Sequence, residues 1–219
     1  MTIRFQGRKV SRRTGVERRE RILNATLAII AREGVRGVRH RAVAAEADVP
    51  LSATTYYFKD LTDLLGDAFR HYARSAMAAN REFEKRSYDA LRQFEGRERT
   101  DEVIAGLVDT LTELTTSHIE YQVTEARDYR LVESAFSDEA LRDPGLKKVL
   151  VNKFQVVVDL IEAFLALAGS PNAALDSKLL LATILRTEYE CILRGTEQSF
   201  DRPAVEQVIR RQVELILRS

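Results

Sequence analysis

Residues 43–58 read VAAEADVPLSATTYYF, and this stretch decides the fold. The alanines in its first half let a helix approach its neighbours closely, and Asp48-Val49-Pro50 then breaks that helix. Asp48 tolerates a turn conformation better than most residues other than glycine, and Pro50 pre-sets the backbone for a new helix. The stretch therefore predicts a short helix over about 41–47, a turn, and another short helix over 51–58.

A third helix precedes this pair. From Glu17 the apolar residues recur at three- and four-residue spacing, and Gly34 supplies a stop signal. Three short helices behind a basic arm are typical of a helix-turn-helix unit. The 51–58 helix is rich in hydroxyls, which can donate to phosphate oxygens or meet base edges. The alternative is an ordinary small helical bundle whose Tyr and Phe side chains are core.

Charge is distributed unevenly along the 219 residues, although the net charge is only +1. Residues 1–65 carry 13 Lys+Arg and 7 Asp+Glu, while residues 66–219 carry 21 and 26. The first 41 residues alone have 12 basic and 3 acidic side chains. This pattern is typical of a polyanion-binding module joined to a mildly acidic body, although a solvated basic tail without a partner would read the same way.

The rest of the chain also reads as helical, with no alternating strand pattern of useful length. Start signals at Asp60, Thr100 and Asp143-Pro144, and stops at Gly169 and Gly195, bound most of the segments. We expect an all-α fold of about nine helices, in which the helices after the first three cover about 61–86, 100–116, 118–136, 143–169, 173–195 and 203–218.

Several function classes are disfavoured. The single cysteine, Cys191, excludes a disulfide framework or a Cys-rich zinc module. The three histidines are too few and too scattered to favour a metal-binding site. No Ser-His-Asp set or glycine-rich phosphate loop is present, so we expect neither an enzyme nor a cofactor. No run of about 18 apolar residues and no secretory signal is found, so we expect a cytoplasmic protein.

The quoted stretch, followed by Leu64-Leu65, resembles the signature of TetR-family transcriptional regulators. The resemblance covers about residues 17–66, including a first helix that ends in Gly34. Departures concern single positions: Asp48 stands where the family usually has Gly, Pro50 where it has Ser, and Thr55 where it has Tyr. Leu61 replaces a commonly basic residue, and Arg39 stands where a Thr commonly starts the second helix.

The resemblance implies a homodimer that places two third helices in successive major grooves of a near-palindromic operator. Under this reading the phosphate contacts are Arg39, His40, Arg41, Thr55, Tyr57 and Lys59. The expected contacts to base edges are Leu51, Ser52, Ala53, Thr54 and Tyr56. Arginines of the basic arm would enter the flanking minor groove or add only salt-dependent affinity.

A mixed stripe marks the helix expected over 118–136. Polar and aromatic side chains share one face at three- and four-residue spacing, which is typical of a mostly apolar ligand cavity with a few hydrogen bonds. The alternative is a partly wet helix face in which Glu125 bonds to a neighbour. The resemblance also implies an effector cavity here, and the expected effector-binding residues are His71, Tyr72, His118, Tyr121, Glu125, Tyr129 and Phe136.

The last two predicted helices, about 173–195 and 203–218, carry more apolar side chains than packing these two helices against each other would bury. Self-association into a four-helix bundle explains that surface, and burial within the monomer is the rival explanation. The expected organisation is a basic arm (1–16), a helix-turn-helix domain (17–60) and an all-α effector-binding and dimerisation domain (61–219). The function is then a repressor that a small molecule releases from DNA. The alternative is a helical small-molecule-binding protein whose basic head docks on an acidic protein or membrane surface.

Overall fold

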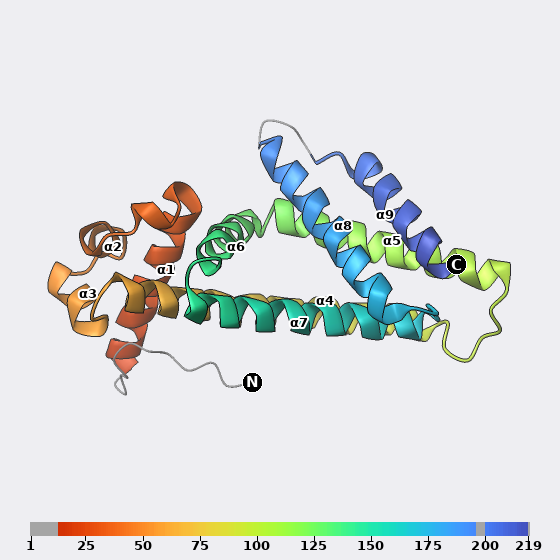
Figure 1. Ribbon diagram of the computed structural model, residues 1–219, viewed down its shortest axis with the longest axis horizontal. Coiled ribbons are helices and arrows are strands. Elements are labelled where there is room, and N and C mark those ends of the chain that lie inside the picture. Colours follow the sequence, from red (N-terminus) through yellow and green to blue (C-terminus); the bar gives the residue numbers. More distant parts are fainter. Residues whose placement is uncertain (1–12, 196–199, 219) are drawn as a thin grey trace. The chain divides into compact units, whose positions relative to one another are not determined.

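The computed structural model describes residues 13–195 and 200–218, except for the side chains of residues 13 and 77–80. These residues form nine α-helices and no strand, which confirms the predicted all-α class (Figure 1). Most of the expected basic arm lies outside the described residues. The elements are α1 (Arg13–Glu33), η1 (Val35–Gly37), α2 (His40–Glu46), α3 (Leu51–Tyr57), α4 (Leu61–Arg92), α5 (Asp101–Val123), α6 (Arg127–Ala140), α7 (Pro144–Leu167), α8 (Ala173–Leu193) and α9 (Arg202–Leu217).

The chain divides into two compact units. One comprises Met1–Ala78 with Asp128–Lys153, and the other comprises Ala79–Arg127 with Phe154–Ser219. The long helices α4 and α7 therefore each contribute one part to either unit. The first unit extends beyond residue 60, because the start of α4 buries Leu64 and Phe69 completely.

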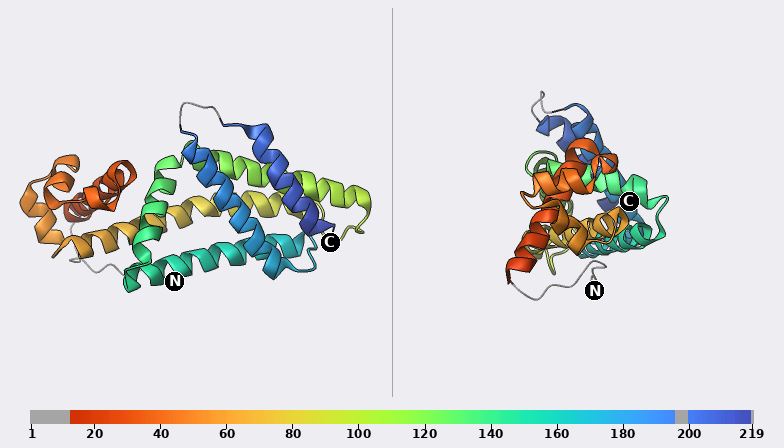
Figure 2. Two further views of the ribbon diagram at one scale, coloured as in Figure 1. Left: turned by 45° about the horizontal axis from the view of Figure 1, so that its top comes forward. Right: turned by 90° about the vertical axis from the view of Figure 1, so that its left-hand side faces the viewer.

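The first unit is built on α1. Helix α2 contacts both α1 and α3, and these three helices gather together in both views (Figures 1 and 2). Ile22 and Ile29 of α1 are almost fully buried, as is Phe58 directly after α3. The rings of Phe69 on α4 and Phe136 on α6 lie 4.5 Å apart between centroids. Burying these large apolar side chains is the main force that holds α3 in place.

Local turn chemistry sets the boundaries of these helices. Gly34 ends α1 with φ 73°, a conformation that costs glycine little. Asp48 adopts φ 49° in the turn before α3, which confirms the expectation that it replaces glycine there. Asp60 accepts a hydrogen bond of 2.9 Å from the Asp63 amide and so caps α4 as predicted.

The region around residue 120 differs from the sequence-based expectation. We expected helices over 100–116 and 118–136, but α5 runs unbroken to Val123 and α6 begins only at Arg127. The Thr124 hydroxyl donates to the Glu120 carbonyl at 2.7 Å, and Thr124 leaves helical geometry with φ −105° and ψ −83°. The chain therefore breaks at a β-branched residue that hydrogen-bonds back to its own helix.

The second unit is a bundle around one apolar core. Helix α9 packs on both α5 and α8 (Figures 1 and 2). Leu107 of α5, Leu180 of α8 and Ile209 of α9 are among its buried side chains. Arg99, before α5, donates to the carbonyls of Ala168 at 2.8 Å and Leu217 at 2.7 Å. No described helix is both long and apolar enough to cross a membrane.

Candidate functional site

One face of α3 is open to solvent. Leu51 and Tyr56 keep 45% and 53% of their surface exposed, and Ser52 and Thr55 are exposed as well. These four residues occupy positions i, i+1, i+4 and i+5, so they form a single helical face. That face, called here the α3 face, combines two hydroxyls with an aliphatic and an aromatic side chain.

Two residues expected to contact DNA lie on the opposite side of α3. Thr54 is fully buried and Tyr57 is 5% exposed, so we remove both from the predicted set of contacts. The Thr54 hydroxyl donates to the Leu51 carbonyl at 2.8 Å, and His40 Nδ1 lies 3.2 Å from the same oxygen. Because that hydroxyl has only one proton, His40 Nδ1 is the donor. The sequence pattern missed this because a hydroxyl that locks two helices together looks the same as one that faces a ligand.

Cationic side chains flank α3 in the sequence and belong to the first unit. Arg39, Arg41 and Lys59 are exposed, as expected for phosphate contacts, and Ala53 and His40 are half-buried. No side chain caps the start of α2, where Arg39 stands. The Arg39 guanidinium instead donates to the carbonyl of Arg36 at 3.3 Å. The contact between His40 and Thr54 places the start of α2, where Arg39 and Arg41 stand, next to α3.

A buried ion pair fixes the helices behind α3. Arg19 of α1 bonds to Asp67 of α4, whose side chain is fully buried, and Arg70 bonds to the other Asp67 oxygen at 3.1 Å. The Arg19 guanidinium also lies 5.2 Å from the centroid of the Phe58 ring. This contact ties the end of α3 to α1 and α4, so the α3 face sits on a rigid support.

The expected effector stripe is not a continuous face, which corrects the sequence-based reading. The break at Thr124 interrupts it, and its members fall in different compact units. Tyr121 and Glu125 are exposed near that break, and Tyr129 is 45% exposed on α6. A spacing of three and four residues predicts one face only while the helix continues, and here it does not.

The expected effector-binding residues of the first unit contact other residues of that unit. Tyr72 and Phe136 are buried, and the Tyr129 ring lies 5.8 Å from that of Tyr72. His71 Nε2 lies 2.8 Å from the Asn24 side-chain oxygen. Burial lowers the pKa of His71; the charge of Glu20 opposes this shift, and the charges of Arg74 and Arg19 add to it. These contacts are internal to the first unit.

His118, another expected effector-binding residue, lines a cavity. The cavity lies in the second unit, has a volume of about 80 Å³, and is enclosed by α4, α5, α7 and α8. Its wall is apolar except for Ser87, Thr115 and His118. We missed Ser87 because we expected that helix to end at Arg86, whereas α4 continues to Arg92.

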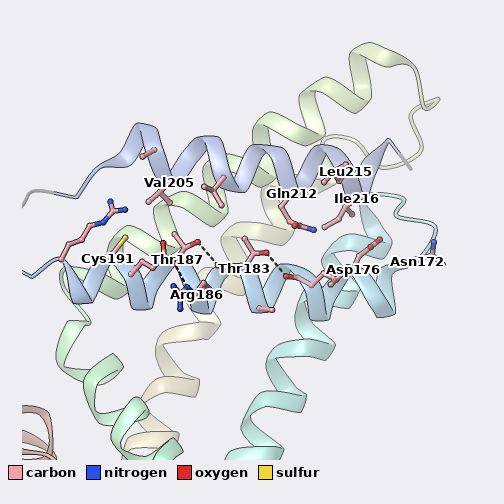
Figure 3. A pocket seen from close by; sticks show the side chains of 16 residues that line it. Asn172, Asp176, Thr183, Arg186, Thr187, Cys191, Val205, Gln212, Leu215 and Ile216 are labelled. Carbon is pink, nitrogen blue, oxygen red and sulfur yellow. Dashed lines mark hydrogen bonds and ion pairs between the residues drawn. The ribbon is translucent and has the colours of Figure 1, made fainter.

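A larger open groove runs between α8 and α9 (Figure 3). Its volume is about 850 Å³, and its lining includes Leu179, Val208 and Leu215. All three are about half exposed, and Leu175 and Leu193 of α8 are more exposed still. The two helices expected to drive self-association therefore keep apolar side chains at the surface of the single chain.

Among the described residues, no group of three or more His, Cys, Asp or Glu side chains could hold a metal ion. No protein-family model matches the chain, and no curated protein matches it. Solved structures do. A member of the TetR family from Streptomyces coelicolor A3 has 26% identity and a TM-score of 0.59, covering 90% of this chain and 98% of that one.

Two further solved structures are similar to this chain. The multidrug binding protein EbrR, solved in complex with ethidium, has 27% identity and a TM-score of 0.59 over 90% of this chain and 98% of that one. A putative TetR-family regulator from Mesorhizobium loti has a TM-score of 0.70 over 95% of this chain and 98% of that one. Because it shares only 17% identity, it is evidence for the fold alone. The resemblance of residues 17–66 is thus confirmed, and over about 90% of its length the chain has the fold of the TetR-family transcriptional regulators.

Proposed function

We propose that this protein is a homodimeric, sequence-specific DNA-binding regulator, and that a small-molecule effector releases it from DNA. The observation that carries the proposal is the α3 face, a polar and aromatic helix surface flanked by exposed cations. The similarity to transcriptional regulators supports it. A shared fold does not establish a function, so the proposal has to be tested on the residues of α3.

The contacts divide into two kinds. Arg39, Arg41 and Lys59 bind phosphates and fix the register of the protein on the duplex. His40 and Thr55 add hydrogen bonds at the edge of this set. The residues that read base edges are Leu51, Ser52, Ala53 and Tyr56. Thr54 and Tyr57 hold α3 in place from inside.

A second copy of this chain is the proposed occupant of the exposed α8 and α9 surface. Exposed leucines on both helices, Leu179, Leu193 and Leu215, form an apolar surface that a twin bundle would cover. A two-fold axis pairs like with like, so each α8 and α9 would face its own copy in a four-helix bundle. Dimerisation then sets the distance between two α3 helices, and an effector that favours a different spacing lowers DNA affinity.

The test is selection from a random-sequence duplex library with the full-length chain. The proposal expects enrichment of an inverted repeat whose half-sites are about one helical turn apart, roughly 10–10.5 base pairs between centres. Binding to the selected duplex should weaken steeply with added salt. A library that shows no enriched sequence, with the chain binding vesicles of anionic lipid instead, overturns the proposal and favours docking of a basic head on an acidic surface.

A further inference from the structure

Helix α3 carries none of the side chains that read guanine, adenine or cytosine most specifically. Its sequence, LSATTYY, has no Arg or Lys to pair with guanine, no Asn or Gln to pair with adenine, and no Asp or Glu to accept from cytosine. Its hydroxyl groups do not replace them, because a hydroxyl both donates and accepts and so matches several base edges. Among the direct contacts of α3, sequence preference therefore falls to its apolar side chains.

Thymine is the base that offers an apolar group in the major groove. Its C5-methyl group lies there beside the O4 acceptor, whereas cytosine presents an amino group and the purines present polar atoms. An apolar side chain against the methyl group removes the apolar surface of both from water, which is favourable. The same side chain against an amino group or a ring nitrogen would bury a polar atom without a partner. An apolar side chain on α3 thus favours thymine.

Leu51 is placed for such a contact. It is the first residue of α3, and the residues at the start of a recognition helix are those that contact base edges. Its carbonyl accepts a hydrogen bond of 2.8 Å from the hydroxyl of Thr54, which is fully buried. The Leu51 backbone is therefore anchored to the interior of the first unit, while 45% of the residue stays exposed.

Tyr56 provides a second apolar surface on the α3 face. Its ring packs edge-on against the ring of Tyr57, with centroids 5.1 Å apart and an interplanar angle of 84°, and Tyr57 is buried. Leu51 and Tyr56 are five residues apart, which is about 7.5 Å along a helix. Successive base pairs are only about 3.4 Å apart, so the two side chains contact different base pairs.

We propose that α3 recognises thymine by its methyl group and that Leu51 makes one of these contacts. This rests on the proposed function, because it names the base that the α3 face reads. The phosphate contacts from Arg39, Arg41 and Lys59 carry no direct sequence information and do not affect it. An enriched inverted repeat without conserved thymines would leave the proposed function standing and overturn this inference alone. A library without any enriched sequence would overturn both.

The test measures how the full-length chain binds altered versions of the selected duplex. Each conserved thymine is replaced in turn, in both half-sites, by deoxyuridine, which lacks only the methyl group. At the thymine that Leu51 contacts, Kd should rise about fourfold for each lost methyl group, or about fifteenfold for the two half-sites together. At the same position, 5-methylcytosine should bind more tightly than cytosine. Equal binding of the thymine and deoxyuridine duplexes at every position, or of the cytosine and 5-methylcytosine duplexes, overturns the proposal.

A variant assigns the contact to Leu51. Leu51→Ala should bind the thymine and deoxyuridine duplexes with affinities that differ by less than about twofold, because the side chain that senses the methyl group is gone. Leu141→Ala is the matched control, since Leu141 is exposed directly after α6, and it should keep the full difference of about fifteenfold. A difference that survives in Leu51→Ala, or that disappears equally in Leu141→Ala, contradicts the assignment.

Discussion

Tyr72 donates a hydrogen bond of 2.6 Å to Glu133, and this bond joins α4 to α6 inside the first unit. Glu133 also binds Lys153 of α7 at 2.5 Å and Arg130 of its own helix at 2.6 Å. The carboxylate is 5% exposed, so it is a buried anion that two cations and a hydroxyl satisfy. The same unit carries α3.

Replacing Glu133 by Gln should destabilise the protein by about 3 kcal/mol, because Lys153 and Arg130 would then face a neutral amide in a buried site. Chemical denaturation of the full-length chain measures the effect. Glu125→Gln is the control, since Glu125 is exposed and its loss should change the free energy of unfolding by less than about 0.5 kcal/mol. Equal stabilities of the two variants would show that the cluster contributes little.

The same carboxylate predicts a dependence of stability on pH. Burial alone would raise the pKa of Glu133, but the charges of Lys153 and Arg130 and the hydrogen bonds from Lys153 and Tyr72 outweigh it, so its pKa lies below the usual value. A lowered pKa in the folded state stabilises the protein above the unfolded value, about 4.3, and this contribution is lost as the pH falls through the folded pKa. The stability gap between the unaltered chain and Glu133→Gln should therefore be constant near pH 7 and shrink below about pH 4. A gap that stays the same down to pH 3 would contradict this.

A charge on the exposed face of α8 should prevent self-association. Leu179→Glu places a carboxylate where the proposed four-helix bundle buries a leucine, so the dimer dissociation constant should rise more than about a hundredfold. Sedimentation equilibrium measures it. Leu141→Glu is the matched control, because Leu141 is 81% exposed directly after α6 and lies outside α8 and α9. If Leu179→Glu dimerises like the unaltered chain, the interface lies elsewhere.

Arg41 should contribute affinity without specificity. Removing one phosphate contact in Arg41→Gln should reduce the slope of log affinity against log salt by about 0.9, and by the same amount for selected and unrelated duplexes. Arg142, exposed after α6, provides the control, and Arg142→Gln should leave the slope unchanged. Fluorescence anisotropy at four salt concentrations separates the two variants. A loss confined to the selected duplex would instead make Arg41 a base contact.

Local signals were predictable from the sequence. Gly34, Asp48 and Asp60 each determine the backbone within a few residues of themselves, and the structure confirms all three. The extent of α4 and the break at Thr124 were not predictable, because weak local preferences, such as that of a single threonine, do not determine where a helix ends.

The candidate sites were also predictable only in part. The exposed half of α3 follows from helical spacing, but the burial of Thr54 depends on His40, which lies on another helix. The cavity was missed for a similar reason. Its wall combines residues of four helices that are far apart in the sequence, such as Ser87 of α4 and Leu181 of α8. The residue spacing within one helix therefore does not reveal the cavity.

The central claim is that the α3 face reads base sequence. The most direct test is the affinity of Tyr56→Ala for the selected duplex and for an unrelated one, with Tyr121→Ala as a control of similar exposure on α5. The account predicts that Tyr56→Ala loses about tenfold or more on the selected duplex and little on the unrelated one, while Tyr121→Ala binds both like the unaltered chain. Unchanged binding of the selected duplex by Tyr56→Ala, in a chain that still folds and dimerises, would contradict the account.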